Sequence, residues 1–110
     1  LGQHAKAVTD YEAFLTKTGT DQGRFRLAAI EGLAYAYEAQ KAWDKALKAV
    51  SKLERKGQAK YTALFHEARI YAAKGDKAEA IKRYKEVADK ASARTLANQA
   101  GQRLAALESK

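Results

Sequence analysis

The sequence of 110 residues contains no cysteine, no proline and no methionine, and it has only seven glycines. Without cysteine, the chain can form neither a disulfide bond nor a thiolate metal site. Without proline and with little glycine, it lacks the residues that most strongly interrupt helices. It also lacks any apolar run near the roughly 20 residues that a membrane-spanning helix requires. Because the chain starts at Leu1 and has no methionine, we expect a fragment of a longer protein.

The residues that dominate the chain are helix formers, chiefly Ala, Lys, Glu, Leu and Arg. These side chains lose little rotamer freedom in a helix. Apolar residues make up 46% of the sequence, which argues against intrinsic disorder. The length suits a single domain over residues 1–110 with a modest core.

Apolar residues recur at helical spacing along the whole chain. The pattern predicts six helices, at about residues 3–16, 25–40, 43–56, 60–74, 77–91 and 93–109. The breaks between them are short, which indicates antiparallel hairpins. We expect Gly57 to cap the third helix at its C-terminus and Asp76 to cap the fifth at its N-terminus. The predicted core includes Ile30, Leu33, Ala34, Tyr37, Ala46, Leu47, Val50, Leu53, Leu64, Ala68, Tyr71, Ala80, Ile81, Tyr84, Val87, Leu96, Ala100, Leu104 and Leu107.

One phrase occurs twice: AKGDKAEAIKRY at residues 73–84 echoes AQKAWDKALKAV at residues 39–50, an offset of 34. A period of 34 residues that spans two helices is typical of a helical solenoid. Small residues match as well, and alanines at matched positions would let paired helices approach closely. The matched pairs are Ile30 with Leu64, Ala34 with Ala68, Tyr37 with Tyr71, Ala46 with Ala80, and Leu47 with Ile81.

In LAYAYEAQKAWDKAL and ARIYAAKGDKAEAI, the sequence resembles the tetratricopeptide repeat family. The segment LGQHAKAVTDYEAFL looks like the second helix of a truncated repeat, and LANQAGQRLAALE looks like a terminal solvating helix. The resemblance implies an all-α, right-handed α-solenoid of antiparallel helix hairpins, with two full repeats and flanking half-units. Two departures from the family pattern are that no proline ends a repeat and that Glu67 takes the position of Leu33.

Candidate catalytic and metal-binding residues are few. The stretch HEARI begins like a zinc-protease helix, but Ile70 takes the place of the second histidine, so we expect His66 to be a partly exposed helix residue. The serines lack a nearby histidine and the glycines of a nucleophile elbow. We therefore expect no enzyme activity, no cofactor and no metal site.

The net charge of +8 is concentrated between Lys41 and Lys60, which hold seven basic and two acidic residues. Most of these lie on one face of the third predicted helix, opposite its apolar residues. This face is either a solvated surface or a surface that attracts an acidic partner or an anionic membrane. No aromatic residue interleaves the lysines, so specific nucleic-acid binding is not expected. The lysine stripe consists of Lys45, Lys48, Lys52, Arg55 and Lys56.

The family resemblance implies a non-enzymatic scaffold whose concave surface, lined by the first helix of each repeat, binds a peptide or a partner helix. The lysines and asparagines that clamp a chain terminus in some members are missing, so we expect an apolar anchor and a basic residue in the ligand. The expected partner-binding residues are Glu31, Tyr35, Glu38, Phe65, Arg69, Asn98 and Gln102.

Three further hypotheses concern the partners and the location. The chain is alternatively a basic helical module for an anionic membrane surface or polyanion, or a self-association domain. A homodimer would pair through the N-terminal helix, where Val8, Tyr11 and Leu15 lack the preceding hairpin partner. Any membrane contact would be peripheral. The closing RLAALESK resembles soluble repeat domains of bacterial envelope scaffolds, which favours that location.

Overall fold

The computed structural model describes residues 6–9, 12, 23–53 and 57–109 of the chain. These residues are helical apart from turns, caps and short connections, and they contain no strand, so the predicted all-α fold of helix hairpins is confirmed. The chain divides into two compact units, Leu1–Leu53 and Glu54–Lys110. The single repeat domain over residues 1–110 and its right-handed superhelix stay predictions.

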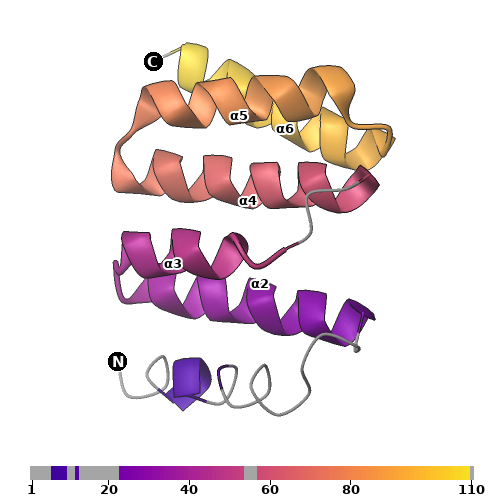
Figure 1. Cartoon of the computed structure of the whole chain (residues 1–110). Helices are drawn as coiled ribbons and strands as arrows, with labels where there is room; N and C mark the ends of the chain where they lie inside the picture. The colour runs from indigo at the N-terminus through magenta and orange to yellow at the C-terminus, as the bar shows by residue number, and fades with distance from the viewer. Residues whose placement is uncertain (1–5, 10–11, 13–22, 54–56, 110) are drawn as a thin grey trace. The chain divides into compact units, whose positions relative to one another are not determined.

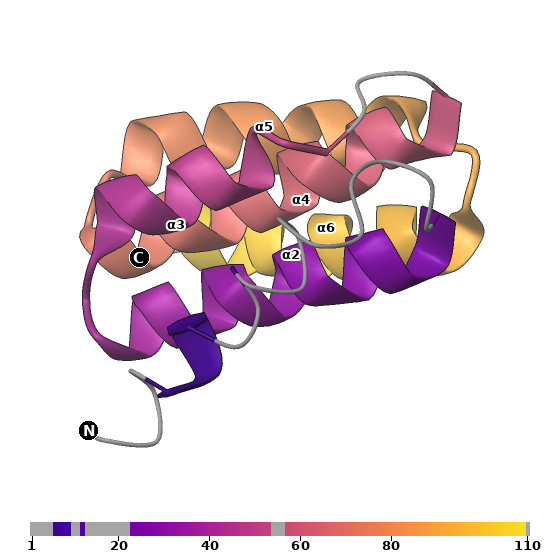
Figure 2. The same cartoon turned by 60° about the horizontal axis from the view of Figure 1, so that its bottom comes forward.

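The first unit contains α2 (Gly23–Ala39) and α3 (Trp43–Val50), which pack against each other as a hairpin. Figure 2 shows the two helices running in opposite directions from the turn that joins them. Residues 6–9 are also helical, and the rest of the helix predicted over residues 3–16 lies outside the described residues except for Glu12. As predicted, the buried residues include Ile30, Leu33, Ala34, Tyr37, Ala46, Val50 and Leu53, whereas Leu47 is only half-buried.

The α2–α3 turn requires a left-handed backbone conformation at Lys41, whose φ is 59°. The amide of Ala42 donates to the carbonyl of Tyr37 at 2.9 Å, which closes the end of α2. Thirty-four residues later, Gly75 has a φ of 100°, and the amide of Asp76 donates to the carbonyl of Tyr71 at 2.8 Å. The two turns therefore have the same hydrogen bond, although only the second has the glycine that this conformation favours.

α3 ends at Val50, six residues before the predicted end at residue 56. The hydroxyl of Ser51 donates to the carbonyl of Lys48. The amides of Lys52 and Leu53 then bond three residues back, to the carbonyls of Ala49 and Val50. Such bonds tighten the last turn and end the α-helical hydrogen-bond pattern. The prediction of a third helix through residue 56 is therefore wrong, as is the prediction that Gly57 caps it.

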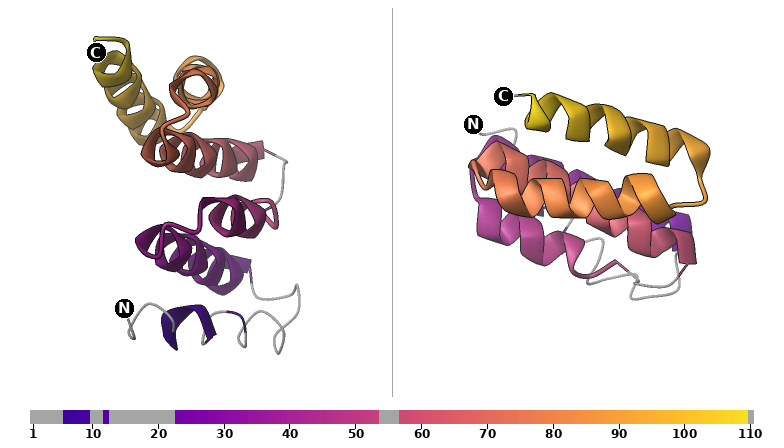
Figure 3. Two further views of the ribbon diagram at one scale, coloured as in Figure 1. Left: turned by 90° about the vertical axis from the view of Figure 1, so that its left-hand side faces the viewer. Right: turned by 90° about the horizontal axis from the view of Figure 1, so that it is seen from above.

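The second unit contains α4 (Gly57–Lys74), α5 (Lys77–Lys90) and α6 (Arg94–Glu108). Figure 1 shows α4 and α5 as one hairpin, and the right panel of Figure 3 shows α5 and α6 as the next. Gly57, with a φ of 53°, begins α4 rather than ending α3. The side chain of Asp76 accepts a hydrogen bond from the amide of Glu79 at 3.4 Å, so its predicted role as N-cap of α5 is confirmed.

The core of the second unit combines alanines with aromatic and aliphatic side chains. Ala68, Ala80 and Ala100 are each 0% exposed, one on each of the three helices. Such small side chains let helix backbones approach closely, while larger side chains fill the space on either side. The other buried residues of this core are Phe65, Tyr84 and Val87, and the partly buried ones include Leu64, Tyr71, Leu96, Leu104 and Leu107.

Glu67, the departure from the repeat pattern, forms an ion pair with a residue of α5. The Nε atom of Arg83 lies 3.3 Å from Oε1 of Glu67, and both side chains are mostly buried. Arg83 also binds the Glu79 carboxylate, and its guanidinium lies 4.4 Å from the ring centroid of Tyr71. A charged residue is thus accommodated at a core position because its partner helix supplies the opposite charge.

Candidate functional site

The predicted partner-binding residues of the first unit share one face of α2. The side chain of Tyr35 is 52% exposed. Among the residues that the structure describes, no other large hydrophobic side chain is classed as exposed. Glu31 and Glu38, four residues before it and three after it, are half-buried. Residues at these spacings lie next to one another on a helix surface. The α2 surface defined by Glu31, Tyr35 and Glu38 therefore combines one accessible aromatic ring with two carboxylates.

In the second unit, Phe65 belongs to the core, although it lies off the predicted apolar stripe of its helix. It is 8% exposed, and its ring meets that of Tyr84 edge to face, with centroids 5.6 Å apart. The guanidinium of Arg103, on α6, lies 5.5 Å from the Phe65 centroid. Phe65 therefore packs against α5 and α6, and its binding role stays a prediction. Nothing in the sequence pattern singled out Arg103.

The polar residues predicted in this unit are more accessible. Asn98 and Gln102 are exposed on α6, and Arg69 is half-buried on α4. An Arg69 guanidinium nitrogen lies 3.1 Å from Nδ1 of His66. His66 is only 6% exposed, so the expectation of a partly exposed histidine is wrong: it contacts Arg69 and the edge of Phe65 instead of solvent.

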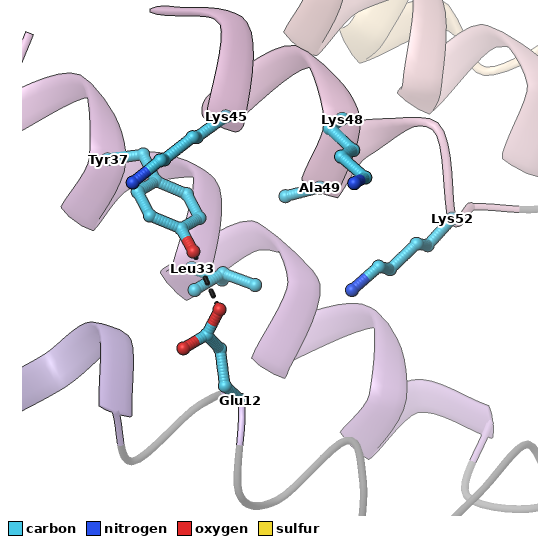
Figure 4. Close-up of a pocket in the computed structure, with 7 residues that line it drawn as sticks. All are labelled: Glu12, Leu33, Tyr37, Lys45, Lys48, Ala49 and Lys52. Atoms are coloured by element: carbon cyan, nitrogen blue, oxygen red, sulfur yellow. Dashed lines mark hydrogen bonds between the residues drawn. The ribbon is translucent and has the colours of Figure 1, made fainter. Parts of the chain in front are cut away.

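A pocket of about 310 Å³ lies in the first unit, beside the lysine stripe of α3. Figure 4 shows Lys45 over the Tyr37 ring, with Lys48 and Lys52 lying on the opposite side of the opening. Arg55 and Lys56 of the predicted stripe lie outside the described residues. The sequence did not reveal this pocket, whose lining residues are Glu12, Leu33, Tyr37, Lys45, Lys48, Ala49 and Lys52.

A hydrogen bond crosses one wall of this pocket. The Tyr37 hydroxyl donates to Oε2 of Glu12 at 2.7 Å. Burial, the hydrogen bond to Glu12 and the charge of that carboxylate together raise the pKa of Tyr37 to about 12, and burial is the largest of the three causes. The Lys45 ammonium lies 6.0 Å from the centroid of the Tyr37 ring. The phenol therefore remains neutral at physiological pH.

The described part of the chain contains no group of three or more His, Cys, Asp and Glu side chains that could hold a metal ion. None of its helices combines the length and apolar character needed to cross a bilayer. The homodimer through the N-terminal helix stays a prediction, since Val8 is half-buried while Tyr11 and Leu15 lie outside these residues.

The family model of the tetratricopeptide repeat matches residues 62–93. This range covers most of α4 and all of α5, the two helices that Arg83 joins. No curated protein and no solved structure gave a significant match to the chain. The α4–α5 hairpin of this chain therefore matches the tetratricopeptide repeat, a motif of protein–protein interaction.

Proposed function

We propose that this protein is a non-enzymatic scaffold that binds a peptide or helix of another protein on the first helices of its repeats. The observation that carries the proposal is the exposure of Tyr35, at 52%, between two half-buried glutamates on α2. Tyrosine is enriched at interfaces because it buries a large apolar ring while its hydroxyl keeps a polar partner. An interface gives such a ring the apolar contact that solvent does not.

The charges around Tyr35 favour a particular ligand. Glu31 and Glu38 flank the ring at helical spacing, so a ligand residue that covers the ring would lie within reach of a carboxylate. A positively charged residue next to an apolar one satisfies both features. We therefore expect the ligand segment to combine an apolar anchor with a neighbouring lysine or arginine.

The second unit has a polar surface of its own, which contains other residues predicted to bind the partner. Asn98 and Gln102 are exposed on α6, and side-chain amides both donate and accept hydrogen bonds. Arg69 adds a charged donor on α4. Phe65, which is also predicted to bind the partner, lies in the core of this unit. Its replacement by alanine would remove a core ring at a cost of about 3–5 kcal/mol, so Phe65 is unsuited to a binding test.

A peptide-display selection with the whole chain as bait tests the proposal. The selected peptides should share an apolar residue beside a basic one, and Tyr35→Ala should weaken their binding about tenfold or more, as interface tyrosines commonly do. Tyr35→Phe keeps the ring and should retain most of the affinity. Glu31→Gln with Glu38→Gln should reduce the preference for the basic residue.

Lys85→Ala, an exposed change on α5, serves as the control and should leave binding unchanged. Circular dichroism would establish that each variant is folded. Binding of the selected peptides to folded Tyr35→Ala with the wild-type affinity would contradict the proposal.

A further inference from the structure

The pocket of the first unit occupies a position that a side chain fills in the next repeat. At the offset of 34 residues, Ala49 corresponds to Arg83, and Leu33 corresponds to Glu67. Arg83 extends over the ring of Tyr71 and binds two glutamates. The methyl group of Ala49 cannot reach as far, and a pocket of about 310 Å³ lies beside it. The two repeats therefore differ by one long side chain at equivalent positions.

Two charges near this position are reversed between the repeats, whereas Lys48 corresponds to another lysine, Lys82. Lys45 and Lys52 stand at the positions of Glu79 and Glu86 in the next repeat. There Glu79 binds the cationic side chain of Arg83, while Glu86 lies 3.6 Å from the ammonium group of Lys60. In the first unit Lys45 and Lys52 instead line the pocket. A ligand group that complements this pocket is therefore negatively charged, opposite in charge to Arg83.

The lysines at the pocket are available to a ligand. Within the described part of the chain, neither Lys48 nor Lys52 forms an ion pair, and both side chains are exposed. Among the described lining residues, the one carboxylate is that of Glu12, which accepts the hydroxyl hydrogen of Tyr37. These described residues, with three lysines and one glutamate, carry a formal excess of two positive charges (3 − 1 = 2).

We propose that this pocket binds an acidic side chain of a partner protein, a carboxylate or a phosphate monoester. The oxyanion would lie between Lys48 and Lys52, and the hydrocarbon stem would contact Leu33, Ala49 and the Tyr37 ring. Lysine ammonium groups bind phosphate and carboxylate as point charges, and these bonds are stronger than neutral ones. The volume is at the low end for ligand pockets, which suits a single side chain.

This site is separate from the α2 surface proposed for the scaffold function. Successive helical residues are rotated by about 100°, so Leu33 and Tyr37 point away from the side of α2 that carries Tyr35. The inference therefore goes beyond the proposed function and does not depend on it. A partner recognised at both sites would carry a basic residue in one segment and an acidic residue in another.

The test uses the whole chain and three short peptides that differ at one position. The position holds phosphoserine, glutamate or unmodified serine in an otherwise uncharged sequence. Amide NMR shifts and isothermal titration should show binding of the phosphoserine or the glutamate peptide, with the shifts at Tyr37 and residues 45–53, and none for serine. Vesicles of phosphatidylserine provide the comparison with a membrane surface.

Two kinds of variant test the pocket itself. Lys48→Gln with Lys52→Gln should weaken binding at least about tenfold, because each removes a charge-assisted hydrogen bond. Ala49→Arg should abolish binding by placing in the pocket the side chain that the next repeat has there. The matched controls are Lys82→Gln, at the position equivalent to Lys48, and Ala78→Arg at an exposed position of α5.

The outcomes separate the explanations. Loss of binding in the pocket variants with retention in both controls supports the inference. Equal weakening by Lys82→Gln would overturn it, because the effect would then follow net charge alone. Binding to vesicles but to neither acidic peptide would also overturn it, and would favour a membrane surface as the ligand. If Ala49→Arg fails to fold, the lysine variants still decide the question.

Discussion

Arg83 on α5 places its Nε atom 3.3 Å from Oε1 of Glu67 on α4, which joins the two helices that match the tetratricopeptide repeat through a mostly buried ion pair. We expect Arg83→Ala to destabilise the chain by about 2 kcal/mol, since it leaves a charged carboxylate without this hydrogen bond. The double change Glu67→Leu with Arg83→Ala copies the residues of the first repeat and should recover most of that loss. Urea denaturation would measure both values.

The control for this prediction is Lys82→Ala, which changes an exposed neighbour on α5 and should alter stability little. If the double variant were as unstable as Arg83→Ala alone, the ion pair with Glu67 would not explain the stability that Arg83 contributes.

The equivalent turn residues Lys41 and Gly75 should respond in opposite directions to substitution. Both have positive φ, 59° and 100° respectively, and a side chain makes this conformation unfavourable by roughly 1–2 kcal/mol. Gly75→Ala should therefore lower the free energy of unfolding by about 1 kcal/mol, and Lys41→Gly should raise it by up to about 1 kcal/mol. Thermal unfolding followed by circular dichroism would show whether the two signs differ.

Tyr37 should ionise at higher pH than an ordinary tyrosine, whose pKa is 10.0, because its folded-state pKa is about 12. Since the folded value exceeds the unfolded one, the resulting stability is complete below pH 10.0 and is lost as the pH rises through about 12. The difference in ultraviolet absorbance between wild type and Tyr37→Phe during an alkaline titration would isolate this phenol.

Glu12→Gln should lower the pKa of Tyr37 but leave it above the ordinary value, because burial is the largest cause of the shift. An unchanged pKa in this variant would mean that Glu12 does not accept the Tyr37 hydrogen in solution.

Ala80 should not tolerate a larger side chain. It is 0% exposed and lies in the core where α5 faces α4 and α6. Ala80→Leu should destabilise the chain by about 1–3 kcal/mol, the usual effect of overpacking. Ala78→Leu places the same side chain on the exposed side of α5 and should have little effect on the melting temperature. Equal melting temperatures for the two variants would contradict this packing.

The helices with strong periodicity were predictable from the sequence within three residues at each end. The apolar positions of α2, α5 and α6 repeat without interruption, and Asp76 gives a clear start to α5. The end of α3 was not predictable in the same way. The residues after Val50 include good helix formers, whereas the hydrogen bond from Ser51 to the Lys48 carbonyl and the tightened last turn end the helix there.

The candidate site was predictable only in part. Tyr35 is exposed as the periodicity of α2 indicates, because one apolar stripe accounts for the buried side of that helix. Phe65 lies beside the apolar stripe of α4 and is nevertheless buried, because α6 adds a second contact surface that periodicity within α4 does not reveal. The pocket beside the lysines depends on a missing side chain at Ala49, which becomes visible only by comparison with Arg83 in three dimensions.

The three alanines of the second unit have a consequence for how this protein can change. Ala68, Ala80 and Ala100 are completely buried, whereas Asn98 and Gln102 on α6 are exposed. Most variants with a substitution at one of these alanines therefore misfold and are lost by selection. Substitutions at the exposed Asn98 and Gln102 affect folding little. Mutational drift in this unit is thus directed to its outer surface, so that new ligand preferences can arise, or be engineered, on a scaffold that stays the same.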